Sequence, residues 1–231
     1  MDTKLTRPPI TAAGQSLAPL IDHTLLKTDT RREQILQLCR EARHYGFAAV
    51  CVPPLHLPLA VSCLSGSNVK AATVIGFPLG FAVTAAKAFE TTAAVEAGAQ
   101  ELDMVLAIGA LKDGNLDYVK NDILAVVRAA RGRTVKVILE TALLTDAEKV
   151  CACRLALEAG AQFVKTSTGL AGGATEADIR LMRQAVGDRM GIKASGGIRT
   201  CRDARAMLRA GATRLGTSAG VAIVTENNSA E

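Results

Sequence analysis

The sequence predicts a single (β/α)8 barrel, a TIM barrel, and three observations support that fold. Short apolar or β-branched runs alternate with amphipathic helical patterns along the whole chain. Most of the helical patterns end at a glycine, as a helix C-terminus favours, and the units recur at intervals of about 20 to 35 residues. The 231 residues suffice for one large core. We therefore expect one domain over 1–231, with an N-terminal extension at 1–16 and a mobile polar tail at 225–231.

Eight strands are expected, each a run of five to seven apolar or β-branched residues. Because helical patterns separate them, the strands should be parallel and should close into a barrel. In chain order the expected strands are 20–26, 48–52, 70–76, 101–107, 135–141, 163–167, 191–195 and 213–218.

The helices are expected between these strands, and several of them open on Thr, Asp or Asn, the residues that cap helix N-termini. The weakest unit is the second, where Pro53, Pro54 and Pro58 interrupt the helical pattern. A doubly wound open sheet is the alternative fold, but it favours a GxGxxG turn after the first strand, and LIDHTLLKTDT has none. The clear helical patterns are 30–46, 84–98, 115–132, 146–160, 176–187 and 201–211.

Composition excludes several classes of protein. A hydrophobic content of 49% is incompatible with a disordered chain. Charged residues interrupt every apolar run before it reaches the roughly 18 residues that a membrane span needs. The N-terminal segment MDTKLTRPPITAAGQ lacks the apolar core of a signal peptide. We expect a soluble, cytoplasmic protein whose six cysteines are free thiols.

Metal and nucleic-acid binding are both disfavoured. The three histidines, His23, His44 and His56, show no ligand spacing, and Cys151 and Cys153 point in different directions on a helix. The net charge of +5 favours acidic small molecules. The basic residues are scattered over helices without interleaved aromatic residues, which argues against binding nucleic acid.

Charged residues inside apolar strands are the main functional signal. Asp22, Asp103, Lys165 and Lys193 all occupy such positions. A lone strand lysine is most often held in a structural ion pair or extends to solvent. Lys165 and Lys193, however, fall on neighbouring strands, about 4.8 Å apart, just before turns of small residues.

Two lysines in one barrel mouth make covalent chemistry possible. A second cation and loss of solvent both disfavour protonation, so one amine should be neutral near neutral pH. A neutral amine attacks a carbonyl, and the resulting imine is an electron sink that allows a carbon–carbon bond to break. The carboxylate of Asp103 could move protons during imine formation, or could simply balance the charge of a lysine.

Two glycine turns suggest a phosphate site. SGGIRT (195–200) and LGTSAG (215–220) follow the seventh and eighth expected strands, where barrels commonly bind phosphate through backbone N–H groups. Gly196 and Gly197 would let the backbone approach an anion, and Ser218 could donate a hydrogen bond. Cys51 also lies at a strand end, although a small buried cysteine is the commoner outcome.

With these motifs in place, the sequence closely resembles the deoxyribose-phosphate aldolase family of class I aldolases. The segments IDHTLLK, TVIGFPLG, ELDMVLAIG, VKVILET, FVKTSTG, IKASGGIRT and RLGTSAG look like that family's segments in the same order. The resemblance implies a TIM barrel, reversible cleavage of 2-deoxy-D-ribose 5-phosphate to D-glyceraldehyde 3-phosphate and acetaldehyde, no cofactor and a homo-oligomer.

The resemblance also implies residue roles. Lys165 would form the Schiff base, assisted in proton transfer by Lys193 and Asp103. The implied phosphate contacts are Gly169, Gly196, Gly197, Arg199, Gly216 and Ser218, and the implied pocket residues are Asp22, Thr24 and Thr166.

Three departures from the family pattern are visible. Pro53 replaces a frequent asparagine, the LAGGAT loop (170–175) is one residue shorter, and the tail TENNSAE has no tyrosine. Two rival functions remain at this point. One is a barrel isomerase or synthase that acts on a phosphosugar without a covalent intermediate. The other is a noncatalytic protein that binds a phosphosugar or a nucleic acid.

Overall fold

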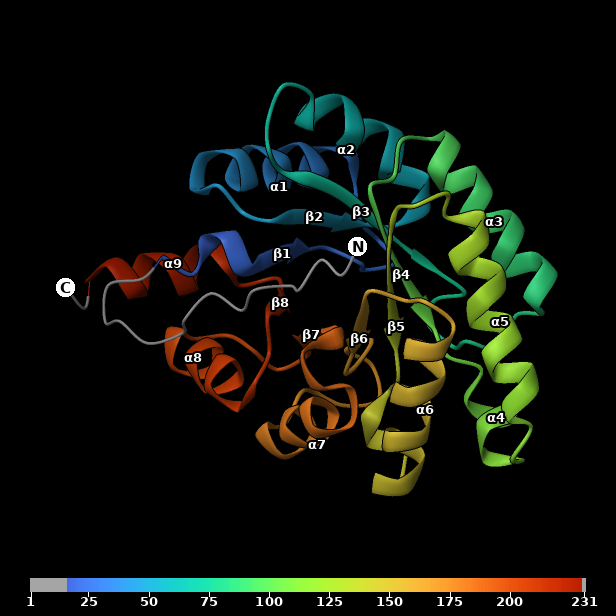
Figure 1. The fold of residues 1–231 in the computed structure, drawn as a ribbon. Helices are drawn as coiled ribbons and strands as arrows, with labels where there is room; N and C mark the ends of the chain where they lie inside the picture. The colour runs from blue at the N-terminus through green and yellow to red at the C-terminus, as the bar shows by residue number, and fades with distance from the viewer. Residues whose placement is uncertain (1–15, 230–231) are drawn as a thin grey trace.

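The computed structural model describes residues 16–229, which form a closed parallel barrel (Figure 1). Each strand pairs with the next along the chain, and the eighth pairs with the first. The predicted barrel is confirmed, and the open-sheet alternative is wrong. The strands are β1 (Ile21–Thr24), β2 (Ala49–Val52), β3 (Lys70–Ile75), β4 (Glu101–Val105), β5 (Thr134–Ile138), β6 (Phe163–Lys165), β7 (Gly191–Ser195) and β8 (Arg214–Thr217).

The helices form an outer layer around the strands, as Figure 1 shows. Short 3-10 turns at Ala18–Leu20, Pro54–His56, Thr141–Leu143 and Gly187–Arg189 join some of the elements. The α-helices are α1 (Arg32–Tyr45), α2 (Leu57–Leu64), α3 (Thr84–Glu96), α4 (Ile108–Lys112), α5 (Leu116–Ala129), α6 (Asp146–Glu158), α7 (Glu176–Val186), α8 (Cys201–Ala210) and α9 (Gly220–Ser229).

The second unit, which the sequence supports least, does contain a helix. Pro54 lies in a 3-10 turn and Pro58 lies in the first turn of α2. Proline is tolerated there because the first N–H groups of a helix have no partner within it. The prolines therefore mark the start of α2 rather than preventing it.

The strands carry two different faces. Residues that point toward the helices are apolar, such as Val50, Leu102, Val137 and Ile192, and they belong to the main buried core. The barrel interior holds a small apolar cluster on β2 and β3, made of Ala49, Cys51, Ala72 and Val74. Charged side chains from the other strands also lie in the interior, and most of them are buried.

Residue 225, where the sequence predicts that a mobile tail begins, lies within helix α9. Helix α9 continues through this stretch, and Asn227 is buried. The Cys201 backbone N–H donates to Glu226 at 2.8 Å, and Arg205 donates to Asn227 at 2.5 Å. This segment has few apolar side chains, and its polar side chains attach it to α8 instead. Residues 1–15 of the predicted extension and residues 230–231 lie outside the described part of the chain.

Within residues 16–229, the helices are too short or too polar for any of them to cross a membrane.

Candidate active site

Lys165 and Lys193 are neighbours on adjacent strands. They are register partners between β6 and β7, so their side chains leave the sheet on the same side. Both amines contact the same oxygen of Asp103 on β4: Oδ2 lies 2.8 Å from Lys165 Nζ and 2.7 Å from Lys193 Nζ. All three side chains are buried. The predicted proximity of the two lysines is confirmed.

A third lysine joins this cluster from β5. Lys136 Nζ lies 2.8 Å from Asp103 Oδ1, 2.6 Å from Glu101 Oε2 and 3.2 Å from Asp22 Oδ2. Arg214 on β8 completes the cluster, with contacts to Asp22 at 2.7 Å and Glu101 at 3.1 Å. Asp22 also forms an ion pair with Lys193, in which Oδ2 lies 2.6 Å from Nζ. We name these seven side chains the interior ion cluster: Asp22, Glu101, Asp103, Lys136, Lys165, Lys193 and Arg214.

Sequence reasoning missed three members of this cluster. Lys136 stands inside the apolar run VKVILE, and Glu101 precedes Asp103 by two residues on the same strand. Arg214 is the first residue of β8. The signal that singled out Lys165 also marks Lys136, because a lysine in an apolar strand must find a buried partner. The period of two would have placed Glu101 on the same face as Asp103.

The pKa values of Lys165 and Lys193 are shifted in opposite directions. Burial lowers the pKa of Lys165, the nearby Lys193 ammonium lowers it further, and contact with Asp103 only partly offsets these effects. Burial also disfavours the charged form of Lys193, but the carboxylates of Asp103 and Asp22 outweigh it and raise the pKa of Lys193. Lys165 is therefore the better nucleophile, and Lys193 stays protonated as an acid.

The two aspartates of the cluster remain ionised. Burial would raise the pKa of Asp103, but the ammonium groups of Lys136, Lys165 and Lys193 hold it well below its usual range. Asp22 behaves in the same way, because Lys136, Lys193 and Arg214 overcome its burial and lower its pKa. Asp103 is consequently a hydrogen-bond acceptor shared by the two site lysines.

Gly216 lies beside the interior ion cluster and is not part of a turn. It lies within β8, and a Cβ atom at this position would come within 2.8 Å of Lys193 Cε and 3.0 Å of Ser195 Cβ. Any larger residue would require the Lys193 side chain to shift from this position. The missing side chain of Gly216 leaves space for Lys193, and its backbone remains available at the barrel mouth.

The other predicted phosphate glycines lie in two loops that touch. Gly169, Gly196 and Gly197 all adopt positive φ, which favours glycine. The Ala174 N–H donates to the Gly196 carbonyl at 3.0 Å, and a Cβ on Gly196 would collide with Gly172 and Gly173 backbone atoms at 2.9 Å. The loop after β6 thus packs against the loop after β7. Added Cβ atoms at Gly169 and Gly197 would meet no atom within 4 Å.

Thr24 and Ser218 share a surface cavity of about 340 Å³ between the ends of β1 and β8 and helix α1. Ser218 is exposed, as is Arg199, whose backbone N–H donates to Asp203. Thr24 donates its hydroxyl to the carbonyl of Asp22. Thr24 and Ser218 are therefore placed where a ligand could reach both.

Asp22 and Thr166 are less available than the sequence analysis expects. Asp22 is fully buried in the interior ion cluster, and Thr166 is buried with its hydroxyl bonded to both the N–H and the carbonyl of Ser195 at 3.0 Å. Thr166 ties β6 to β7 next to the two lysines. Cys51 is also buried, and burial raises the pKa of its thiol.

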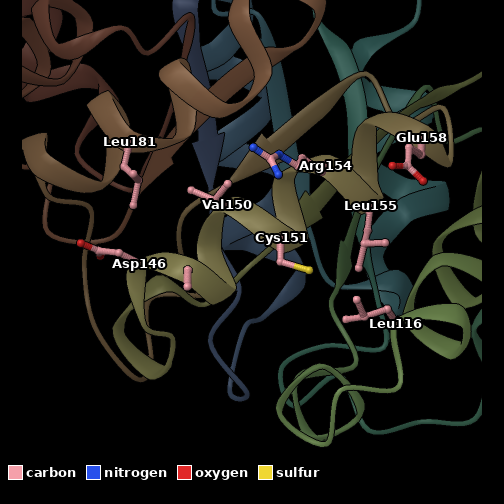
Figure 2. A pocket seen from close by; sticks show the side chains of 9 residues that line it. Leu116, Asp146, Val150, Cys151, Arg154, Leu155, Glu158 and Leu181 are labelled. Atoms are coloured by element: carbon pink, nitrogen blue, oxygen red, sulfur yellow. The ribbon is translucent and has the colours of Figure 1, made fainter.

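A larger cavity, of about 570 Å³, lies on the outer helical layer, away from these residues (Figure 2). Its lining includes Leu116, Val150, Leu155 and Leu181, with Arg154 among the polar side chains. It contains none of the buried lysines or carboxylates, so the chemistry points to the barrel mouth instead. In the described part of the chain, no three His, Cys, Asp or Glu side chains are grouped to hold a metal ion.

Comparison with known proteins places the chain in one family. Residues 17–226 match the model of the DeoC/LacD family aldolases. The chain belongs to the DeoC/LacD aldolase family. A deoxyribose-phosphate aldolase of Staphylococcus epidermidis is 59% identical over 208 residues, which cover 90% of this chain and 94% of that protein. A relative from Halalkalibacterium halodurans, also named deoxyribose-phosphate aldolase, is 57% identical over 219 residues, 94% of this chain and 98% of its own.

A solved structure agrees with this assignment. The deoxyribose phosphate aldolase of Aeropyrum pernix, described as a unique tetramer, is 36% identical, with a TM-score of 0.86 over 93% of this chain and 92% of that chain. The sequence relatives and the solved structure therefore agree on the family and the fold of this chain.

Proposed function

We propose that this aldolase reversibly cleaves 2-deoxy-D-ribose 5-phosphate to D-glyceraldehyde 3-phosphate and acetaldehyde through a Schiff base on Lys165. The observation that carries the proposal is the shared oxygen of Asp103, which holds one lysine of lowered pKa beside one of raised pKa. The names of the relatives supply the substrate. An isomerase or synthase without a covalent intermediate would have no use for this pair.

The first half of the reaction forms the imine. The neutral amine of Lys165 attacks the aldehyde carbon of the open-chain sugar, and the oxygen takes up a proton to give a carbinolamine. Lys193, held protonated by Asp103 and Asp22, is the acid that can protonate this hydroxyl so that it leaves as water. Asp103 accepts hydrogen bonds from both amines before the reaction begins and so holds them close together.

The second half breaks the carbon–carbon bond. A base removes the proton of the C3 hydroxyl, the C2–C3 bond breaks, and its electron pair flows into the protonated imine to give an enamine. D-glyceraldehyde 3-phosphate leaves, C2 of the enamine takes a proton, and water then releases acetaldehyde from Lys165. We assign the proton transfers to Lys193, Asp103 and water. Since the imine itself holds the electron pair, the proposed reaction requires no cofactor or metal.

The phosphate end of the substrate is proposed to bind the glycine loops and the β8–α9 turn. Gly169 and Gly197 present open backbone, and Ser218 lies just before the N-terminus of α9. Backbone N–H groups and a helix N-terminus both favour an anion. Gly196 and Arg199 belong to the same proposed phosphate surround through their loop, and Gly216 through its backbone in β8. Asp22, Thr24 and Thr166 are proposed to form the pocket wall.

Borohydride trapping tests the reaction class and the residue together. The protein is incubated with substrate, reduced with borohydride, digested and analysed by mass spectrometry. We expect one added two-carbon or sugar-derived group, on Lys165. A label on Lys193 would reverse the two roles, and turnover without any trapped adduct would favour the noncovalent isomerase or synthase.

We also propose that the protein is a homo-oligomer, joined through α3 and the preceding loop. This surface exposes Leu79, Phe81, Val83 and Phe89, with exposures of 59%, 80%, 65% and 77%. Its lysine, Lys87, is buried in an ion pair with Asp122. Exposed apolar side chains of this kind can pack against the same side chains of a second copy. The tetrameric relative from Aeropyrum pernix is consistent with a second copy as the occupant.

The mass of the protein in solution tests whether copies meet through this surface or through the outer cavity of Figure 2. We expect Phe89→Glu to lower the mass measured by light scattering, because a charge would be buried at the contact. Leu181→Glu, in the outer groove, is the matched control and should leave the mass unchanged. A native protein that is monomeric would remove the proposal, and dissociation by Leu181→Glu alone would move the interface to the groove.

The remaining proposals concern location and partners. All six cysteines are free, which suits the reducing cytoplasm. Some of the basic side chains lie inside the barrel and are paired with carboxylates, so they do not contribute to a basic surface. These side chains are Lys136, Lys165, Lys193 and Arg214. We therefore propose small phosphorylated sugars and aldehydes, rather than nucleic acid or membrane, as the ligands of this cytoplasmic protein.

A further inference from the structure

The charges of the interior ion cluster do not balance when every member is ionised. Among the described residues, the cluster contains four cationic side chains and three acidic ones. A buried group of charges is most stable near neutrality, because uncompensated charge in a medium of low dielectric is costly. Loss of one proton from one lysine brings the cluster to balance.

The contacts show which lysine is held least firmly. Lys136 lies within 4 Å of three carboxylates, and Lys193 and Arg214 each contact two. Lys165 contacts Asp103 alone. The other titratable groups that act on Lys165 are Lys193 on β7, whose ammonium disfavours a second positive charge, and Cys51 on β2. The excess positive charge of the whole cluster therefore falls on Lys165.

Two members of the cluster are not needed to touch a substrate. Glu101 and Arg214 are the first residues of β4 and β8, and Asp103 follows Glu101 by two residues toward the mouth. Arg214 is held between Asp22, Glu101 and the ring of Phe163, whose centroid lies 5.5 Å from the guanidinium carbon. Glu101 is held by Lys136 and Arg214. Both act on Lys165 through other residues.

We propose that Glu101 and Arg214 are positioning residues that set the net charge of the barrel interior and so decide how readily Lys165 gives up its proton. The proposal rests on the function of Lys165 given above. Each residue contributes one fixed charge, and the two charges have opposite signs. Removing one or the other must therefore move the titration of Lys165 in opposite directions.

The directions follow from the charge count. Glu101→Gln removes one negative charge, so the interior becomes more positive and Lys165 loses its proton at lower pH. Arg214→Met removes one positive charge, so Lys165 keeps its proton to higher pH. Folding should survive both changes, because Lys136 keeps Asp22 and Asp103 in the first variant, and Lys136 still contacts both Asp22 and Glu101 in the second.

The experiment measures the titration of Lys165 with and without catalysis. The acid limb of the kcat/KM profile should move down by about one pH unit in Glu101→Gln and up by about one unit in Arg214→Met. Arg214→Lys keeps the charge and should stay near the native profile. Asp178→Asn breaks an ion pair with Lys149 outside the barrel and serves as the stability control, with no shift expected.

A second readout separates this inference from the proposed reaction. The rate at which an amine-acylating reagent labels Lys165, followed by peptide mass spectrometry over pH, reports the neutral amine directly. Opposite shifts in labelling would support the inference even in a protein without aldolase activity. Shifts in the same direction, or none, in variants that remain folded by circular dichroism would overturn it.

Discussion

Lys165 and Lys193 are register partners on β6 and β7, and their amines converge on a single carboxylate oxygen, Oδ2 of Asp103. The contact lowers the pKa of neither lysine by itself. Burial and the neighbouring ammonium lower the pKa of Lys165, whereas Lys193 also contacts Asp22 and has a raised pKa. Lys193 contacts one carboxylate more than Lys165 does, and this difference separates the proposed acid, Lys193, from the proposed nucleophile, Lys165.

The nucleophile is tested by Lys165→Arg. A guanidinium remains protonated at any pH at which the protein is folded, so it cannot form the imine. We expect kcat to fall at least about a thousandfold. Steady-state assays of deoxyribose-phosphate cleavage, with folding checked by circular dichroism, measure this. Multi-turnover activity near the native rate would contradict the covalent mechanism.

The coupling of the two lysines is tested by Lys193→Leu. The reactive form of Lys165 is the neutral amine, and the Lys193 ammonium lowers the pKa of Lys165. Removing that cation raises the pKa, so the acid limb of the activity profile should move to higher pH, in addition to any loss of rate. Lys149→Leu, on α6, changes the same residue type outside the barrel and should leave the limb in place. An unchanged limb in Lys193→Leu would show that the two amines do not interact.

The barrel could be predicted from the sequence because its signals are local. Each strand is an apolar run, each helix has its own period, and units such as FVKTS and GIKAS place Lys165 and Lys193 at equivalent strand positions. Parallel pairing of successive strands then brings the two lysines together without any knowledge of side-chain packing. The fold and the central residues of the site were accessible for this reason.

The rest of the cluster depends on the stagger of the barrel, which periodicity does not specify. Arg214 contacts Glu101 although the two residues are far apart in the chain and lie on strands that are not neighbours. Whether a strand lysine finds a carboxylate across the interior depends on the relative heights of the strands. The role of Gly216 could not be predicted for the same reason, because it depends on where the Lys193 side chain runs inside the barrel.

The space beside Lys193 is tested by Gly216→Ala. The added Cβ would meet Lys193 Cε at 2.8 Å, which is shorter than a normal contact, so the lysine must move away from Asp103 or Asp22. We expect a loss of about tenfold or more in kcat, with little effect on the KM for substrate. Gly109→Ala, where a Cβ meets nothing within 4 Å, is the control. Native kcat in Gly216→Ala would mean that the lysine adjusts without cost.

The phosphate site is tested by Ser218→Asp. This change places an anion at the start of α9, where the phosphate is proposed to bind, so the two negative charges would repel each other. We expect the KM for 2-deoxy-D-ribose 5-phosphate to rise about tenfold or more, while the slow cleavage of unphosphorylated 2-deoxy-D-ribose changes little. Ser218→Ala separates the lost hydrogen bond from the added charge. Equal losses on both substrates would make Ser218 structural.

The end of the chain is tested by Glu226→Ala. Glu226 accepts the backbone N–H of Cys201, the first residue of α8, and so satisfies a group that has no partner within that helix. A carboxylate at a helix N-terminus also favours the helix dipole. Its loss should cost about 1 kcal/mol, which lowers Tm by roughly 2–4 °C in a protein of this size. Thermal unfolding followed by circular dichroism measures the change.

A chain that ends at Val224 extends the same test. It lacks Glu226 and also Asn227, which accepts Arg205 on α8, so its Tm should fall further than that of Glu226→Ala. The tail contains no tyrosine and none of the interior ion cluster, so we expect cleavage activity at 25 °C to remain within about twofold of native where the protein is folded. Glu96→Ala, at an exposed surface pair with Arg131, controls for loss of a single carboxylate. If the shortened chain stays folded but loses about a hundredfold in kcat, the tail takes part in the chemistry. A Tm equal to that of the full chain would instead show that its contacts with α8 contribute nothing to stability.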